Sequence, residues 1–497
     1  MRRRAISFAF AQLCFVALTA AADTTTTTAT NPVSNARKTA GTATHATSRT
    51  TAHTTAHATT HVTTKHESTH PKTPVPNTVN SPAPTSYATA TPPAATAHKR
   101  GTRAKRRVAA VSPAVRQAAL TEVTDRMTVR GSHFENAAAL VPFFELMKNA
   151  QQSGQAVHIL QFGDSHTASD DWANAMRIAF QSKYGDGGPG FTHAGHPFRG
   201  YRRFDVSGSS STGWVTEGTI AQMGDGRDGL GGISITAHSP GQTVSLTTSC
   251  DRLQLFYLQQ PDGGSLEFSV DDKQVGVIDT RGELASGVYE YKPEPGTHEY
   301  LLRTRSQDSV RLFGWASDAN RGVTVETLGI NGAQVNVMLN WDQTLWSAEV
   351  AERDPALIIL AYGTNEANNP KFWWEEYRTE LRTVLARVRK AAPAASILMI
   401  GPPDCGRTRA LPYLDDVVRV QREVAREAGV AFWDWRENMG GPGATDLWVK
   451  AGLGQADHIH LTGAGYQLLG QALFEELELE NAHYRSAEQA TSFQTPR

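Results

Sequence analysis

Ser165, Asp457 and His460 are the residues whose types and spacing point most directly to chemistry. Ser165 lies in FGDSHTASD (162–170), and the other two lie three residues apart in DHIHLTGAGY (457–466). An aspartate can orient and polarise a histidine, and that histidine can take the proton of a serine hydroxyl. The three residues therefore predict acyl transfer, with Ser165 as nucleophile, His460 as general base and Asp457 as its orienting partner.

Two loops offer groups that stabilise the negative charge such an attack creates. GINGAQ (329–334) contains Gly332, whose backbone N–H no side chain covers. YGTNEA (362–367) contains Asn365, whose side chain can donate an N–H. With the N–H of the nucleophile itself, these groups form a predicted oxyanion hole. Gly329 is the rival of Gly332 for this role.

Other residues in these blocks have simpler interpretations. His458 and His166 compete with His460 as the base, but the D-x-x-H spacing favours His460 and leaves the other two as lining or structural residues. A serine at a helix start can simply cap the helix, and Asn365 can be a turn residue. The G-x-S-x-G elbow of the α/β-hydrolases is absent. The chemistry of the three residues requires no metal and no cofactor.

Elements that can position these residues follow from the hydrophobic pattern. Short apolar runs predict strands at 156–162, 356–362, 396–403 and 430–435. Apolar residues at helical spacing predict helices at 167–184, 372–392, 413–429 and 466–480. Their alternation predicts an α/β fold with a parallel sheet covered on both faces. Each block that carries chemistry stands at the end of a predicted strand.

The region 195–322 breaks this alternation. It contains alternating runs at 253–258, 265–270, 274–279 and 300–305, separated by turn-rich segments such as QPDGG (260–264). This texture predicts an antiparallel β-sandwich inserted into the α/β domain. Its aromatic residues are candidates for stacking on sugars, although core packing is their commoner role: Trp214, Tyr257 and Trp315.

The first 108 residues have a different character. Residues 1–22 combine three arginines, an uncharged apolar run and small residues, which predicts a secretory signal and hence a periplasmic or secreted protein. Residues 23–108 are rich in Thr, Ala, His and Pro and predict a disordered linker. Its seven histidines suit a flexible tether better than a metal-binding tract. Its basic end, HKRGTRAKRR (98–107), offers contact with an anionic wall polymer or membrane surface.

The four blocks, in this order, resemble blocks I, II, III and V of the SGNH (GDSL-like) hydrolases. G-D-S is similar to block I, G-I-N-G to the G-x-S-G loop of block II, G-T-N to block III and D-H-I-H to block V. The resemblance covers about 109–194 and 323–485 and leaves 486–497 as a tail. It implies an SGNH-type three-layer domain with the roles given above, in which the N–H groups of Ser165 and Gly332 and the amide of Asn365 form the oxyanion hole.

Export, a G-D-S-H block and an inserted sandwich also resemble the periplasmic peptidoglycan O-acetylesterases, whose inserted domain is similar to a carbohydrate-binding module. This resemblance implies removal of acetyl groups from an O-acetylated glycan through an acetyl-serine intermediate. Three alternatives remain: an esterase for plant polysaccharides such as xylan, a glycan O-acetyltransferase, and a non-catalytic glycan-binding protein. The complete set of catalytic residue types speaks against the last of these.

Net charge and cysteine count add little. A formal net charge of −1 gives no reason to expect nucleic-acid binding, and we expect a monomer. If the signal is removed, Cys250 and Cys405 remain, and the sequence leaves open whether they form a disulfide or stay free thiols.

Overall fold

The computed structural model describes residues 111–128, 132–406 and 411–494. The predicted signal and linker lie outside these ranges. The catalytic part is built on a six-stranded sheet in the order β1-β17-β16-β15-β2-β14, in which only β1 is antiparallel to its neighbour. The strands are β1 (Phe134–Glu135), β2 (Ala156–Gly163), β14 (Gly322–Gly329), β15 (Leu357–Ala361), β16 (Ser396–Ile400) and β17 (Ala431–Trp433).

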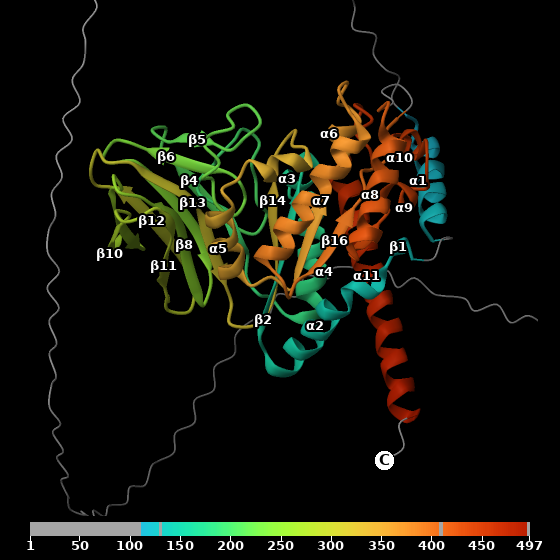
Figure 1. The fold of residues 1–497 in the computed structure, drawn as a ribbon, viewed down its shortest axis with the longest axis horizontal. Helices are drawn as coiled ribbons and strands as arrows, with labels where there is room; N and C mark the ends of the chain where they lie inside the picture. Colours follow the sequence, from blue (N-terminus) through green and yellow to red (C-terminus); the bar gives the residue numbers. More distant parts are fainter. Residues whose placement is uncertain (1–110, 129–131, 407–410, 495–497) are drawn as a thin grey trace, which may run out of the picture. The chain divides into compact units, whose positions relative to one another are not determined.

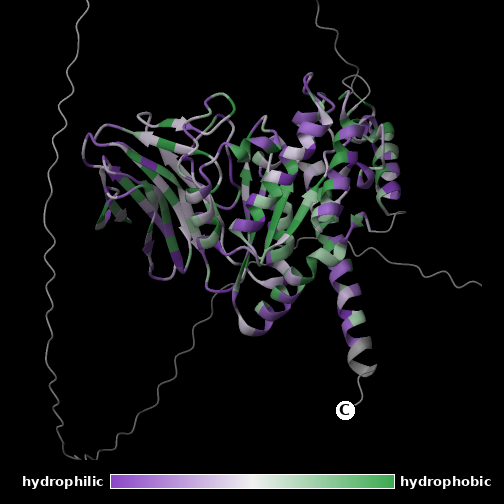
Figure 2. Cartoon of the chain, in the orientation of Figure 1, coloured by the Kyte–Doolittle hydropathy of each residue, from purple (hydrophilic) through white to green (hydrophobic). Residues whose placement is uncertain are grey.

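Helices cover both faces of this sheet (Figure 1). One face packs against α2 (Val141–Ser153), α4 (Asp171–Tyr184), α10 (Ala444–Ala451) and α11 (Gly463–Gln494). The other packs against α5 (Gln343–Arg353), α7 (Trp374–Ala391) and α8 (Leu414–Ala428). The central strands β15, β16 and β17 are almost continuously apolar, as a sheet buried on both faces requires (Figure 2), whereas β2 and β14 also bury polar side chains.

Six further helices among the described residues complete the catalytic part. They are α1 (Pro113–Thr128), η1 (Ala137–Leu140), α3 (Ser165–Ala168), η2 (Val335–Leu339), α6 (Thr364–Ala367) and α9 (Trp435–Asn438). Two of them, α3 and α6, directly follow the carboxyl ends of β2 and β15, so the site is assembled at that edge of the sheet.

Between β2 and β14 the chain forms two antiparallel sheets. One has the order β10-β9-β12-β7-β4, and the other β11-β8-β13-β6-β5, with β3 paired to β13. The first contains β4 (Ser207–Ser210), β7 (Thr243–Ser249), β9 (Ser265–Val270), β10 (Lys273–Asp279) and β12 (Thr297–Thr304). The second contains β5 (Val215–Glu217), β6 (Ser234–Ala237), β8 (Arg252–Gln259), β11 (Ala285–Tyr291) and β13 (Val310–Asp318), joined by β3 (Gly190–His193). The predicted α/β fold with an inserted β-sandwich is therefore confirmed.

The sandwich shares part of its core with the catalytic domain. Phe256 of β8 and Phe313 of β13 lie in the same buried cluster as Phe162 of β2 and Trp346 of α5. A second cluster, between the two sheets of the sandwich, contains Trp315. Apolar contact on this scale fixes the insert against the sheet that carries the site.

Three details differ from the sequence prediction. The helix predicted over 167–184 is interrupted at Asp170, whose φ of 60° lies in the left-handed region, so α3 and α4 are separate. The expected tail at 486–497 continues α11 as far as Gln494. No element was predicted between 109 and 155, where α1 and α2 lie, because α1 buries only Ala119 and Val123 among its described side chains.

Cys250 and Cys405 are buried free thiols in different core clusters. Burial raises the pKa of Cys250 to about 11 and that of Cys405 to about 12, which makes both poor nucleophiles. Among the described residues, none of the helices combines the length and apolar character needed to cross a membrane.

Candidate active site

Ser165 is the first residue of α3, directly after β2 turns. The turn is tight: a side chain at Gly163 would lie 2.2 Å from Thr167 Oγ1 and 2.7 Å from the carbonyl oxygen of Ala361, so only glycine fits. Asp164 caps α3 by accepting the N–H of His166 at 2.9 Å. Ser165 is therefore held half-buried at the helix N-terminus, where the helix dipole favours negative charge.

Asp457 and His460 reach the serine from the loop before α11. Ser165 Oγ lies 2.9 Å from His460 Nε2, and His460 Nδ1 lies 2.7 Å from Asp457 Oδ2. The other oxygen of Asp457 accepts the N–H groups of Ile459 and His460 at 3.0 Å each. Partial burial works against ionisation of Asp457, but these hydrogen bonds outweigh it and hold its pKa below the ordinary value. The loop thus supplies an ionised acceptor that fixes the histidine ring.

The two rival histidines lie elsewhere in the site. His458 has a left-handed φ of 59° and pairs through Nδ1 with Asp446 Oδ1 at 2.8 Å. His166 is buried, and its Nδ1 lies 2.7 Å from the hydroxyl of Tyr466. Burial, with repulsion from the nearby His460 cation, lowers the pKa of His166 to about 3, so this ring stays neutral. Neither rival is hydrogen-bonded to Ser165.

Gly332 lies in the loop between β14 and η2, and Asn365 lies in α6, next to the turn that carries Ser165. Gly332 has a φ of 78°, and its N–H makes no hydrogen bond within the described ranges. Asn365 Nδ2 donates to the carbonyl of Ala333 at 2.9 Å and makes a long 3.4 Å contact with Asp164 Oδ2. The rival Gly329 is buried in β14, where a side chain would lie 2.2 Å from the N atom of Ala168. Gly329 therefore serves close packing against α3.

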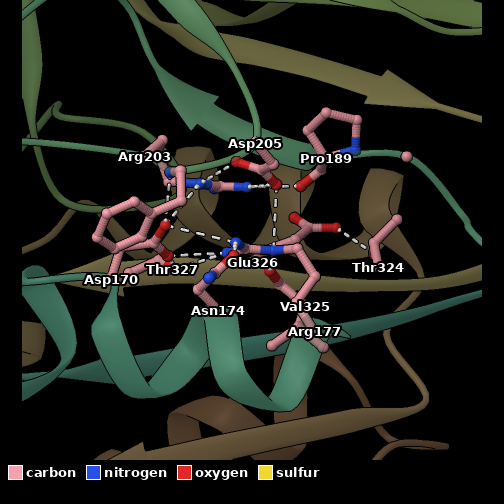
Figure 3. Close-up of polar contacts among 12 residues, drawn as sticks. Asp170, Asn174, Arg177, Pro189, Arg203, Asp205, Thr324, Val325, Glu326 and Thr327 are labelled. Carbon is pink, nitrogen blue, oxygen red and sulfur yellow. Dashed lines mark hydrogen bonds and ion pairs between the residues drawn. The ribbon is translucent and has the colours of Figure 1, made fainter. Parts of the chain in front are cut away.

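A buried ion cluster supports the nucleophile turn from behind (Figure 3). Asp170, directly after α3, binds Arg177 Nη2 at 2.8 Å and lies 3.7 Å from Arg203 Nε. Arg203 also pairs with Asp205 at 2.7 Å and donates to the carbonyls of Phe191 and Pro189 at 2.8 Å each. Arg203 precedes β4, so the cluster joins the first segment of the insert to the turn that carries Ser165.

A second buried cluster joins the last strand of the insert to the catalytic sheet. Arg353 of α5 pairs with Asp318 of β13 and Glu326 of β14 at 2.6 Å each, and its Nη2 lies 2.9 Å from His158 Nδ1 of β2. Burial works against the charge of Glu326, but Arg353 and His158 outweigh it and lower its pKa to about 2. The three smaller groups are close enough to suggest metal ligands, yet the guanidinium already occupies both carboxylates. This cluster is therefore a buried salt-bridge network that connects the insert to the catalytic sheet.

Sequence reasoning missed Asp170, Arg203 and Arg353, because their partners lie in distant segments and no local motif marks them. Of the three insert aromatics, Trp315 is fully buried, which excludes stacking on a sugar without opening the sandwich. Trp214 and Tyr257 are partly buried against the same core. Core packing, the commoner role, therefore describes Trp315.

Comparison with known proteins is consistent with this geometry. The model of the GDSL-like lipase/acylhydrolase family matches residues 301–468. A solved structure described as a peptidoglycan O-acetylesterase in action is 25% identical, covers 71% of this chain and 100% of its own, and has a TM-score of 0.61. No curated protein matches the chain.

Two further structures are carbohydrate esterases. A family two carbohydrate esterase from Clostridium thermocellum is 14% identical over 50% of this chain and 94% of its own, with a TM-score of 0.26. An acetyl xylan esterase from the rumen bacterium Butyrivibrio proteoclasticus is 11% identical over 55% and 98%, with a TM-score of 0.23. TM-scores this low carry no inference about function.

The α/β domain has the SGNH hydrolase fold, and its second part matches the GDSL-like lipase/acylhydrolase family over residues 301–468. The family match and the similar structure together identify a carboxylic ester hydrolase.

Proposed function

We propose that this chain is an exported serine O-acetylesterase that removes acetyl groups from a cell-wall glycan, with peptidoglycan as the principal substrate. The observation that carries the proposal is the hydrogen-bonded series from Ser165 Oγ to His460 Nε2 at 2.9 Å and from His460 Nδ1 to Asp457 at 2.7 Å. The choice of peptidoglycan is supported by the solved peptidoglycan O-acetylesterase structure. That structure is 25% identical to this chain, and the match extends over 100% of its own length.

In the first half-reaction, Ser165 Oγ attacks the acetyl carbonyl carbon while His460 Nε2 takes the hydroxyl proton. Asp457 stabilises the imidazolium that forms. The carbonyl oxygen becomes an oxyanion, and the N–H groups of Ser165 and Gly332 can donate to it without first losing another partner in the described chain. Asn365 can join them because its second N–H hydrogen is engaged only by the long contact to Asp164.

The tetrahedral intermediate then collapses. The C–O bond to the sugar breaks, His460 returns its proton to the leaving sugar hydroxyl, and acetyl-Ser165 remains. A water molecule, deprotonated by His460, attacks the acyl carbon in the second half-reaction, and the proton passes back to Ser165 as acetate leaves. The proton transfers in both half-reactions are supported by the two short contacts, from Ser165 Oγ to His460 Nε2 and from His460 Nδ1 to Asp457 Oδ2.

The test is acetate release by the purified full chain from nitrophenyl acetate, O-acetylated peptidoglycan and acetylated xylan. We expect turnover of the small ester and of peptidoglycan, and Ser165→Ala should abolish both while leaving the far-ultraviolet circular dichroism unchanged. Release from xylan alone would replace peptidoglycan as the substrate. Activity retained by Ser165→Ala would remove Ser165 from its role.

Export is part of the same proposal and is supported by the sequence of residues 1–22 alone. Expression in a Gram-negative host followed by N-terminal sequencing tests it. A mature protein that starts after the small residues near position 22, recovered from the periplasm or medium, is expected. Uncleaved protein retained in the cytoplasm would contradict export.

A further inference from the structure

A polar cavity of about 230 Å³ opens beside the proposed oxyanion hole. It lies between η2 and the start of α7, and three glutamates line it: Glu366, Glu376 and Glu380. Trp373, the N-cap residue of α7, stands at its edge with 55% of its surface exposed, the most exposed tryptophan among the described residues. An exposed indole next to hydrogen-bonding groups is unusual on a surface with no ligand to cover it.

Residues that line the cavity lie next to the proposed oxyanion-hole groups in sequence. Gln334, which lines it, follows Gly332 by two positions and donates its amide to the carbonyl of Asn365 at 3.2 Å. Glu366 follows Asn365 directly and accepts the N–H of Val335 at 2.7 Å. The segments that carry Gly332 and Asn365 therefore also contribute residues to the cavity wall.

Glu366 gives a second, independent indication of a ligand. Its side chain is 2% exposed, and its Oε2 has no hydrogen-bond partner within the described ranges. Burial raises the pKa of Glu366 to about 8, so at neutral pH it is an uncharged carboxylic acid with an O–H to donate. A buried donor without an acceptor costs free energy, and a hydroxyl or water brought to it removes that cost.

The charges around the cavity restrict what it can bind. Glu376 is exposed, and Glu380 is half-buried and accepts the amide of Asn336 at 2.8 Å. Lys371 is the one basic residue among those that line it. This balance disfavours a uronate, a phosphate or an acidic peptide. A pyranose ring has the complementary chemistry, since its C–H face stacks on an indole and its hydroxyls donate to carboxylates.

We propose that this cavity is a subsite for an uncharged sugar unit adjacent to the acetylated one, with Trp373 as the stacking platform and Glu366, Glu380 and Gln334 as hydrogen-bonding groups. The subsite deepens the proposed function and rests on it for the identity of the chain that carries the sugar. Its role is in binding: it holds the polymer so that the acetyl group meets Ser165. A small ester does not reach it.

The experiment compares two readouts on the full chain. The first is binding of chitotetraose and of xylotetraose, both uncharged and without ester groups, measured by titration calorimetry. The second is kcat and KM on an O-acetylated chitotetraose beside nitrophenyl acetate. Trp373→Ala is the test variant, and Trp373→Phe, which keeps an aromatic face, is its matched control.

We expect Trp373→Ala to raise Kd and KM for the tetrasaccharide roughly threefold to tenfold. It should leave kcat/KM on nitrophenyl acetate unchanged, and Trp373→Phe should retain most of the affinity. Glu380→Gln should also weaken binding, because a charged acceptor is stronger than a neutral one. Glu375→Gln, on the same helix but outside the cavity, should not.

Failure of the subsite and failure of the proposed function give different results. If the wild-type protein binds a tetrasaccharide through Trp373 but releases no acetate from any glycan, the subsite is supported and the proposed glycan esterase activity is refuted. Acetate release from the tetrasaccharide with an unchanged KM in Trp373→Ala overturns the subsite alone. The subsite is also overturned if the wild-type protein binds neither tetrasaccharide. The same holds if Trp373→Ala lowers kcat/KM equally on the O-acetylated tetrasaccharide and on nitrophenyl acetate.

Discussion

Replacement of Asp457 by asparagine tests how the site activates its serine. Asp457 Oδ2 accepts the proton on His460 Nδ1 at 2.7 Å, which leaves Nε2 free to accept from Ser165 at 2.9 Å. In Asp457→Asn the carbonyl oxygen can keep the two backbone N–H groups now bound to Oδ1, those of Ile459 and His460. The amide nitrogen then faces Nδ1 as a donor, so the ring must carry its proton on Nε2, where it cannot act as base.

The expected loss follows from that change of tautomer. In the chymotrypsin-type site, the corresponding substitution leaves the geometry intact and lowers kcat about 10⁴-fold, which is about 5.5 kcal/mol of transition-state stabilisation. The same logic holds here because the backbone contacts of the loop are retained. We therefore expect Asp457→Asn to keep its thermal stability within about 1 kcal/mol while kcat on nitrophenyl acetate at pH 7 falls by three to four orders of magnitude.

A matched control lies on α10, which precedes this loop. Asp446 pairs with His458 Nδ1 at 2.8 Å, as Asp457 does with His460, so Asp446→Asn perturbs the rival histidine in the same way. We expect this variant to keep most of the activity. Asp457→Asn activity within tenfold of the wild type, or a comparable collapse in Asp446→Asn, would refute the assignment of His460 as base.

Three further predictions follow from other contacts. Asn365→Ala removes one oxyanion donor and should lower kcat about 10²- to 10³-fold with little change in KM, as measured on nitrophenyl acetate. Arg203→Met removes one of the two cations that hold Asp170 and Asp205 and the donor to two backbone carbonyls, and should lower the free energy of unfolding in urea by about 3–5 kcal/mol. Burial raises the pKa of Glu349 to about 8, so the folded protein favours the protonated carboxylic acid. The stability that this gives is fully present below about pH 4.5, the ordinary pKa of a glutamate, and is lost as the pH rises through about 8. In Glu349→Gln the amide can still accept the N–H of Leu230 and can donate to the hydroxyl of Ser286. This variant should lose most of the pH dependence of the urea midpoint between pH 5 and pH 8, which in the wild type corresponds to a fall of up to about 4 kcal/mol in the free energy of unfolding.

Each of these predictions has a control and a contrary outcome. Asn368→Ala, on the same short turn but exposed, should leave kcat unchanged, and an equal effect of both changes would deny Asn365 its donor role. Arg202→Met removes the contacts of an exposed guanidinium with Asp171 and with the carbonyl of Ser169, and should cost less than Arg203→Met, about 1 kcal/mol. A pH profile of Glu349→Gln identical to the wild type would mean that Glu349 does not carry the predicted dependence.

The secondary structure of the catalytic domain could be predicted where side chains alternate strongly along it. Helices expected at 372–392 and 413–429 are observed at Trp374–Ala391 and Leu414–Ala428, because each has an apolar face with a charged face opposite. The break between α3 and α4 could not be predicted. Asp170 adopts a left-handed conformation there because its carboxylate is held by Arg177 and Arg203, and nothing in the local pattern shows a partner from the insert.

The candidate site divides in a similar way. Ser165, Asp457 and His460 can be selected from sequence because their chemistry depends on residue type and on a short spacing. Which glycine presents a free N–H depends on backbone geometry, and the open position of Gly332 against the packed one of Gly329 is visible only in the structure. The cavity beside Trp373 could not be found from sequence, since its wall combines residues of η2 with residues of α6 and α7, some thirty or more positions later in the chain.

The parallel pairing of β2 with β14 has a consequence for folding. Val157 of β2 pairs with Val323 of β14, so the whole sandwich is synthesised between these neighbours. The strand that leads into Ser165 therefore forms its pairing with β14 only after the sandwich has been made. Closing so long a loop is slow unless the intervening chain has already collapsed into its own core. The sandwich has such a core. Asp457 and His460 follow both the sandwich and the last strand of the catalytic sheet in sequence, so Ser165 has no base until residue 460 has left the ribosome.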